Sequence, residues 1–202
     1  MYKRIPFEQR SPEWLAYRKT KIGASESATI MNMNPWQTPR ELFRQKMGIT
    51  EANFDNAKMK EGRELESVAL EAFLNQFKHN FILEQPTLES IEFPWMFASL
   101  DGFYEPKSFV IESKSGKSAH KIALTGKVPE YYFPQCQQIL CVTGFERMFF
   151  WSYYPCYKGL DRIMIEVERD EPFICELIKE TRKFWDCMLN LEEPTNEGVE
   201  FQ

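Results

Sequence analysis

The sequence predicts an α/β (α+β) fold in which a central mixed β-sheet is flanked by helices. Its 202 residues suffice for one compact domain with a real core, and no repeat, low-complexity tract or long linker divides the chain. Helical and strand-like segments also follow one another in a mixed order. We expect helices up to about residue 78, a hairpin over 95–114, a helix near 130–142, strands over 146–154 and 160–168, and a C-terminal helix. Residues 1–202 should therefore form a single domain, ending in a frayed acidic tail from about residue 192.

The N-terminal segment predicts two short helices. Ser11 followed by Pro12 is typical of an N-cap with proline at the first helical position. Ser25 precedes residues 26–31 and is expected to be the N-cap of the second helix. A helix N-terminus with free amides, a hydroxyl and a nearby guanidinium such as Arg18 can bind phosphate. On these residues alone, simple capping by Ser25 and a surface charge at Arg18 remain the favoured alternatives.

A longer amphipathic helix is expected over residues 59–77. Its apolar residues recur at helical spacing, namely Leu65, Val68, Ala69, Ala72, Phe73 and Phe77. Glu66 lies at the edge of that apolar stripe, where a carboxylate could reach into a cleft between helix and sheet. It could equally be one more solvated acid on the helix surface.

The acidic and basic residues of the predicted hairpin carry the chemistry. Residues 97–102 are expected to form one strand that ends in a polar turn, and residues 108–114 its partner, with Asp101 placed opposite Glu112 and Lys114. Side chains alternate along a strand, so Glu112 and Lys114 should share a face while Ser113 points away. Two carboxylates opposite each other suit Mg²⁺ or Mn²⁺, and Lys114 could orient or deprotonate a water or stabilise phosphate charge. A solvated face with a cross-strand ion pair is the simpler alternative for this pattern taken alone.

The C-terminal half predicts the remaining elements. Pro134 should open a helix that carries Gln135 and Gln138 one turn apart, where an amide could hold a water or a phosphate oxygen, although surface glutamines are common. The apolar run 149–154 alternates poorly, which favours a strand buried on both faces over a base-stacking platform. Residues 171–191 have the apolar spacing of an amphipathic helix.

Charge is distributed unevenly along the chain, whose formal net charge is −5. Residues 1–60 carry 11 Lys and Arg against 6 Asp and Glu, whereas residues 160–202 carry 5 against 12. The basic N-terminal section could follow phosphates while the acidic C-terminus faces outward. The balance permits DNA binding but argues against tight non-specific binding by a monomer.

Cysteine and histidine usage predicts no zinc or iron–sulfur site. The five cysteines, at 136, 141, 156, 175 and 187, include no C-x-x-C pair, and there are two histidines. With no signal peptide or transmembrane run, we expect a cytoplasmic protein with reduced thiols, in a bacterium or a phage-infected host, and no membrane partner.

Five motifs in order resemble the lambda exonuclease and YqaJ-type viral recombinase family of the PD-(D/E)XK nuclease superfamily. They lie between about Gln9 and Glu168. The motifs are residues 10–39, with the Ile22–Ser25 and Asn34–Pro39 segments; Gly62-x-x-Leu65-Glu66-x-x-Ala69; Ser99–Gly102; Glu112–Lys114; and Gln135-x-Gln137 with Val142–Gly144. Family members often have an apolar residue between the Glu and the Lys, and a Cys-Pro pair after the Lys. Here Ser113, Ser115 and Gly116 occupy those positions.

The resemblance implies a role for each matched residue and a restriction-endonuclease-like core. Asp101, Glu112 and Glu66 would bind Mg²⁺, with Mn²⁺ as a substitute, and Lys114 would be the catalytic lysine. Gln135 would lie close to them. The 5′-phosphate end of DNA would be held by residues matching the family's phosphate-binding positions, Arg18, Ser25 and Ser99.

The function that the resemblance implies is degradation of one strand of linear duplex DNA from its 5′ end. The remaining 3′ single strand would pass to a single-strand annealing protein in phage-type homologous recombination. The family often forms a trimeric ring around duplex, which would offset weak electrostatic binding. Two alternatives remain: an endonuclease of restriction or repair type on the same core, and an inactive DNA-end or annealase-binding module. The intact set of Asp101, Glu112, Lys114 and Glu66 argues against the inactive module.

Overall fold

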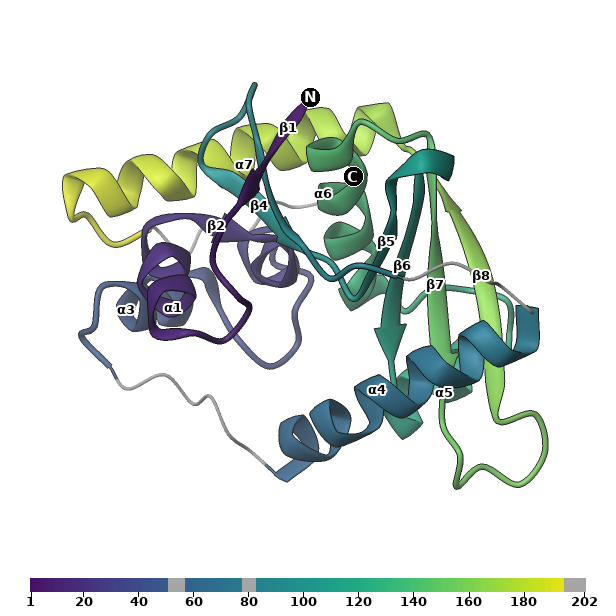
Figure 1. Cartoon of the computed structure of the whole chain (residues 1–202). Helices are drawn as coiled ribbons and strands as arrows, with labels where there is room; N and C mark the ends of the chain where they lie inside the picture. The colour runs from purple at the N-terminus through teal and green to yellow at the C-terminus, as the bar shows by residue number, and fades with distance from the viewer. Residues whose placement is uncertain (51–56, 78–82, 195–202) are drawn as a thin grey trace.

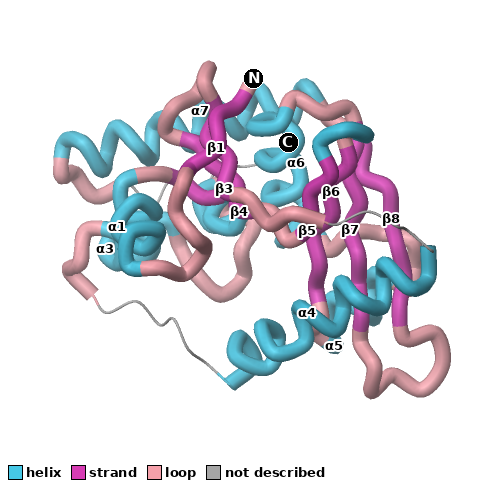
Figure 2. Tube along the Cα trace, in the orientation of Figure 1, coloured by secondary structure: helices cyan, strands magenta, loops and turns pink. Residues whose placement is uncertain are grey.

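A computed structural model describes residues 1–50, 57–77 and 83–194, which form two four-stranded mixed sheets (Figures 1 and 2). The first has the order β1-β3-β4-β2, with β1 (Tyr2–Ile5), β2 (Ile22–Gly23), β3 (Thr87–Ser90) and β4 (Met96–Ser99). The second has the order β5-β6-β7-β8, with β5 (Gly102–Tyr104), β6 (Phe109–Lys114), β7 (Arg147–Tyr153) and β8 (Arg162–Glu168). The parallel pairs are β2 with β4 and β6 with β7.

Helices cover both sheets (Figure 1). They are α1 (Pro12–Thr20), α2 (Ser27–Ile30), α3 (Pro39–Lys46), α4 (Ala57–Phe77), α5 (Lys117–Ala123), α6 (Phe133–Thr143) and α7 (Glu171–Asn190), with 3-10 helices η1 (Ala24–Glu26), η2 (Glu105–Lys107) and η3 (Glu130–Tyr132). The predicted mixed α/β fold is confirmed, as are the helices near 59–77, 130–142 and 171–191. No helix in the described part of the chain is long and apolar enough to span a membrane.

The predicted hairpin is wrong in its first strand. β4 pairs with β3 and β2 in the first sheet, and the hairpin partner of β6 is β5 in the second. The chain passes from one sheet to the other at residues 100–101, between β4 and β5. Gly102 permits this crossing, because a Cβ there would lie 2.3 Å from the Ile111 side chain on β6. We call residues 100–101 the sheet crossover.

The helix caps match the sequence prediction at one position and not at the other. Ser11 caps α1, and its side chain accepts a hydrogen bond from the backbone N–H of Trp14 at 3.1 Å. Ser25 is not an N-cap, because it lies inside η1, and α2 begins two residues later. Instead, the Glu26 carboxylate accepts a hydrogen bond from the Gly23 backbone N–H at 2.9 Å, so the turn is capped by a residue three positions later.

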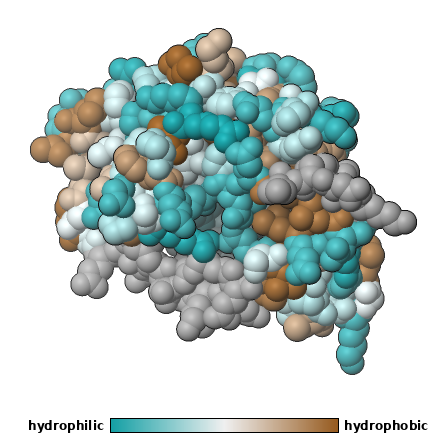
Figure 3. All heavy atoms as spheres, in the orientation of Figure 1, coloured by the Kyte–Doolittle hydropathy of each residue, from teal (hydrophilic) through white to brown (hydrophobic). Residues whose placement is uncertain are grey.

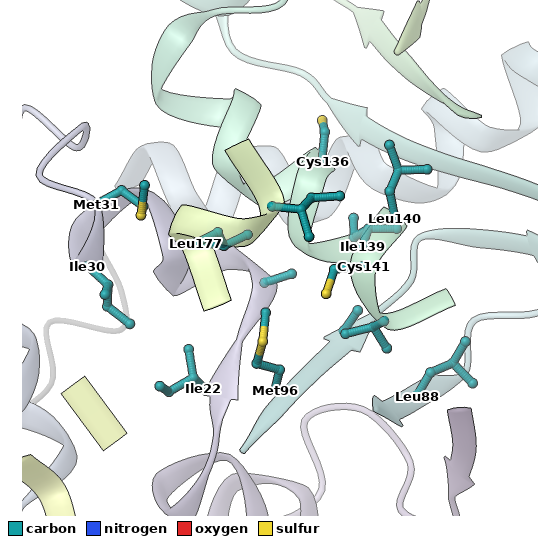
Figure 4. Packing of buried hydrophobic residues seen from close by; sticks show 14 of the residues in the cluster. Ile22, Ile30, Met31, Leu88, Met96, Cys136, Ile139, Leu140, Cys141 and Leu177 are labelled. Atoms are coloured by element: carbon teal, nitrogen blue, oxygen red, sulfur yellow. The ribbon is translucent and has the colours of Figure 1, made fainter. Parts of the chain in front are cut away.

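The main core packs helices α6 and α7 against both sheets, and Figure 4 shows the part around Ile22, Met96 and Leu177. Two glutamines of α6 fix the helix in place. Gln138 donates to the backbone carbonyls of Ile22 on β2 and Phe97 on β4, at 3.0 and 3.1 Å. Gln137 donates to the carbonyl of Glu168 at the end of β8, at 2.9 Å. Helix α6 is therefore bonded to both sheets.

A second, smaller core joins α4 to the second sheet. Ala69 and Phe73 of α4 pack with Trp151 of β7, and the Trp151 indole N–H donates to the Ala69 carbonyl at 2.9 Å. Trp151 is fully buried, which confirms the predicted buried strand. The side chain of Phe77, predicted to belong to the same stripe, lies outside the described residues, as do residues 195–202 of the expected tail. This packing positions Glu66, one turn before Ala69.

Candidate active site

The sheet crossover brings Asp101 against the end of β6. The Asp101 carboxylate accepts a hydrogen bond from the Ser113 backbone N–H at 2.8 Å. On the same strand, the Lys114 ammonium contacts Glu112 Oε1 at 2.5 Å. Three of the predicted site residues therefore lie together. Ser113 contributes its backbone, while its hydroxyl is buried and has no hydrogen-bond partner.

Helix α6 closes the site from the other side. The Gln135 side-chain amide donates to Glu112 Oε1 at 2.5 Å, so Gln135 lies where the sequence predicted it. Gln138 does not join it, because its amide binds the backbone of the first sheet. Glu112 is only 2% exposed, and its second oxygen, Oε2, is buried without a hydrogen-bond partner. A buried carboxylate oxygen with no partner is costly and marks a position for a ligand.

Glu66 reaches the same region from α4 and is held there by Arg10 and Gln85. Arg10 forms an ion pair with Glu66 at 2.7 Å. The Gln85 amide contacts Glu66 at 3.5 Å and the Asp101 backbone carbonyl at 3.1 Å, which links the two acidic residues. Nothing in the sequence distinguished Gln85, whereas Arg10 belonged to the basic N-terminal section.

A pocket of about 590 Å³ opens beside this acidic group, and its lining includes Arg10, Glu66 and Gln85. The space-filling view shows mostly hydrophilic residues across the middle of the face drawn in Figure 3. A polar, open surface of this kind suits a charged ligand better than an apolar one.

Burial and the neighbouring carboxylates disfavour the charged form of Asp101. Burial raises the pKa of Asp101 well above its usual 3.8, and the charges of Glu112 and Glu66 raise it further against the opposing effect of Lys114. Burial lowers the pKa of Lys114, but Glu112 and Asp101 outweigh burial and hold that pKa above its ordinary value. Lys114 is therefore an ammonium at neutral pH, and the lysine does not fully compensate the carboxylates.

The donor set fits a hard divalent cation. Among the described residues, no group of three or more His, Cys, Asp or Glu side chains is arranged to hold a metal ion. Mg²⁺, however, is commonly held by one or two carboxylates, with waters and substrate phosphates completing its shell. The carboxylates of Glu112 and Asp101 provide such a pair. Glu112 Oε2 has no hydrogen-bond partner, and a cation would relieve the repulsion of Asp101 by Glu112 and Glu66, so the residues fit Mg²⁺ or Mn²⁺.

The three predicted phosphate-binding residues meet around Trp14. Arg18 donates to the Ser25 hydroxyl at 3.0 Å, and its guanidinium lies 5.3 Å from the centre of the Trp14 ring. The indole N–H of Trp14 bonds the Ser99 hydroxyl at 3.2 Å. Two hydrogen bonds and one cation–π contact through Trp14 therefore connect Arg18, Ser25 and Ser99.

A buried ion cluster of Glu26 and Lys46 holds Arg18 in place. Glu26 forms ion pairs with Arg18 at 3.1 Å and with Lys46 at 2.8 Å. The Lys46 ammonium also donates to the backbone carbonyls of Arg18 and Lys21, at 2.9 and 2.7 Å. Burial raises the pKa of Glu26, but Lys46 and Arg18 outweigh it and lower that pKa below its ordinary 4.5.

Comparison with solved structures places this architecture in the class of exonuclease-like α/β folds. The chain is similar to an alkaline exonuclease, LHK-Exo, from Laribacter hongkongensis, with a TM-score of 0.76 and 25% identity over 90% of this chain and 94% of the other. LHK-Exo in complex with dAMP matches equally well. A phage-related exonuclease from Haemophilus somnus 129PT shares the fold, with a TM-score of 0.62 and 15% identity over 85% of this chain and 96% of the other.

The sequence then identifies the family. The chain belongs to the YqaJ-like viral recombinase domain family, whose model matches residues 13–146. It is also 27% identical over 198 residues to the uncharacterized protein YqaJ of Bacillus subtilis (strain 168). That match covers 95% of this chain and 60% of the relative, so the chain spans about three fifths of the relative's length. The resemblance inferred from the five motifs is thereby confirmed.

Proposed function

We propose that the protein is a Mg²⁺-dependent exonuclease that degrades one strand of linear duplex DNA in the 5′-to-3′ direction. The observation that carries the proposal is the contact of Glu112 with both Lys114 and Gln135, beside Asp101, with one Glu112 oxygen left unpartnered. Membership of a viral recombinase family and similarity to an alkaline exonuclease support it.

Each residue of the site has a role in this proposal. Asp101 and Glu112 would bind the cation, and Glu66 would complete the acidic group. When bound, the divalent ion would supply Lewis-acid stabilisation of charge on the scissile phosphate. Lys114, whose ammonium lies 2.5 Å from Glu112, would stabilise the charge that develops there. Gln135 would orient Glu112.

The biological role follows from the polarity of degradation. Removal of one strand from its 5′ end leaves a 3′ single strand, which a single-strand annealing protein would take up in recombination. A ring of three copies around the duplex would keep the enzyme on its substrate despite its net negative charge. We place this activity in the cytoplasm of a bacterium or of a phage-infected host.

The test compares linear and closed-circular duplex of the same sequence in Mg²⁺, with EDTA as a control. We expect complete digestion of the linear form, no change in the circle, and no digestion of either form in EDTA. An exonuclease needs an end and therefore spares the circle. Nicking or linearisation of the circle would indicate an endonuclease on the same core, and full activity in EDTA would exclude the metal-dependent chemistry.

Replacing Arg18 with alanine is expected to weaken the preference for 5′-phosphorylated ends. A doubly charged phosphate facing a partly shielded guanidinium is worth roughly 1–3 kcal/mol, or about ten- to a hundredfold in rate or affinity. The wild-type protein should digest 5′-phosphorylated duplex faster than 5′-hydroxyl duplex, and Arg18→Ala should reduce that ratio. Time courses on both substrates, with end-labelled DNA to report strand polarity, measure it.

Lys19→Ala is the matched control, since Lys19 is the neighbouring cation on α1 and is exposed. It should leave the preference ratio unchanged. An unchanged ratio in Arg18→Ala would remove Arg18 from the phosphate site. Release of label from the 3′ end first would overturn the proposed direction.

A further inference from the structure

The segment between α2 and α3 exposes a tryptophan. The side chain of Trp36 is 70% exposed. The other four tryptophans also lie in the described part of the chain: Trp14, Trp95 and Trp151 are buried, and Trp185 stacks on Trp95. Trp185 is partly exposed, so Trp36 is the most exposed of the five tryptophans, and the site described above does not use it.

Hydrogen bonds hold the backbone of this segment in one conformation. The Trp36 backbone N–H donates to the Asn34 side chain at 3.0 Å, and the Asn34 amide donates to the Thr29 hydroxyl at 2.8 Å. Two residues later, Thr38 caps α3 and forms a capping box with Glu41. A ring carried on a fixed backbone loses little conformational entropy when it binds a ligand.

A row of aromatic rings connects Trp36 to the candidate active site. The ring centres of Trp36 and Tyr131 lie 4.8 Å apart at an interplanar angle of 77°. Tyr131 contacts Tyr132 at 4.7 Å, and the Lys114 ammonium lies 5.0 Å from the centre of the Tyr132 ring. Because stacked nucleotides are spaced about 3.4 Å apart along one strand, Trp36 lies within a few nucleotides of a phosphate at Lys114.

We propose that Trp36, supported by Tyr131, stacks an unpaired base of the DNA strand whose phosphate lies at Lys114. The edge-to-face contact with Tyr131 braces Trp36 without covering both faces of the indole. Aromatic platforms bind single-stranded DNA through stacking on the faces of bases, largely independently of sequence. This inference rests on the proposed nuclease function, because the unpaired base belongs to the DNA strand that the site would cleave.

Tryptophan fluorescence tests the proposal directly. The probe is a 5′-phosphorylated oligothymidylate, added to the full chain in Ca²⁺ without Mg²⁺ so that binding is measured apart from cleavage. We expect quenching of the wild-type emission and its loss in Trp36→Phe. Trp36→Ala should weaken binding of the probe about tenfold, and Trp36→Phe, which keeps a ring, should restore most of it. Leu160→Ala removes an exposed apolar side chain elsewhere and should bind like the wild type.

The outcomes separate this inference from the proposed function. Two results would overturn the stacking role of Trp36 alone, provided that the wild type cleaves linear duplex in Mg²⁺. One is that the oligothymidylate does not quench the wild-type emission, and the other is that Trp36→Ala binds the probe as tightly as the wild type. Absence of cleavage in the wild type would overturn the nuclease proposal, whatever the fluorescence shows. Shielding of Trp36 from iodide before DNA is added, increasing with protein concentration, would assign the ring to a contact between copies and overturn the platform as well.

Discussion

Lys114→Ala is expected to reduce cleavage of linear duplex by at least about 100- to 1000-fold, the loss typical when one pre-positioned charge-stabilising donor is removed. The ammonium of Lys114 contacts Glu112 at 2.5 Å and is held in its charged form by the surrounding carboxylates. Removing it leaves a developing negative charge without its counter-charge. Single-turnover digestion of end-labelled duplex in Mg²⁺ is the measurement.

Binding of a divalent ion distinguishes the roles within the site. Asp101→Ala and Glu112→Ala should abolish both cleavage and Mn²⁺ binding measured by calorimetry, whereas Lys114→Ala should retain most of the binding. Glu66→Ala should reduce activity by a smaller margin, because Glu66 is already paired with Arg10. Lys117→Ala, three residues further along and exposed, is the matched control and should cleave normally. Near wild-type turnover by Lys114→Ala would remove Lys114 from the chemistry.

Lys46→Met is expected to produce the largest loss of stability, about 3–5 kcal/mol in the free energy of unfolding. Lys46 and Glu26 are 4% and 8% exposed, and the substitution leaves a buried carboxylate with only part of its compensation. Arg44→Met on the same helix is the control, because the ion pair of Arg44 with Glu193 is much more exposed than that of Lys46 and should contribute little. Urea unfolding of both variants measures the difference.

The pH dependence of stability provides an independent check on Glu26. Its pKa is lower in the folded protein than its ordinary 4.5, so the unfolded chain takes up the proton first as the pH falls. The stabilisation is therefore complete above about pH 4.5 and is lost as the pH falls through the lower folded value. Between pH 7 and pH 4 the wild type should lose more stability than Glu26→Gln. Equal losses would mean that Glu26 is not held ionised by Lys46 and Arg18.

The residues of the candidate site were largely predictable because their signals are local. The alternation of β6 places Glu112 and Lys114 on one face, and the helical spacing of α4 sets Glu66 at the edge of its apolar stripe. Asp101, Glu112, Lys114 and Gln135 do meet in the structure.

What could not be predicted depends on contacts distant in sequence. The strands β1, β2 and β3 are short, at four, two and four residues, and too brief for a periodic signal. The division into two sheets follows from long-range strand pairing, which no local pattern encodes. For the same reason Gln85, sixteen residues before Asp101, had no signal for its contacts with Glu66 and the Asp101 carbonyl.

The position of Asp101 on the sheet crossover has a mechanical consequence. β4 is anchored in one sheet and β5 in the other, and only Leu100 and Asp101 separate them. There is no slack in such a short span, since each residue reaches about 3.3–3.6 Å. Any sliding of one sheet past the other must therefore shift the Asp101 carboxylate relative to Glu112. We therefore expect a force that displaces one sheet relative to the other to change the distance between the Asp101 and Glu112 carboxylates before it disrupts either sheet.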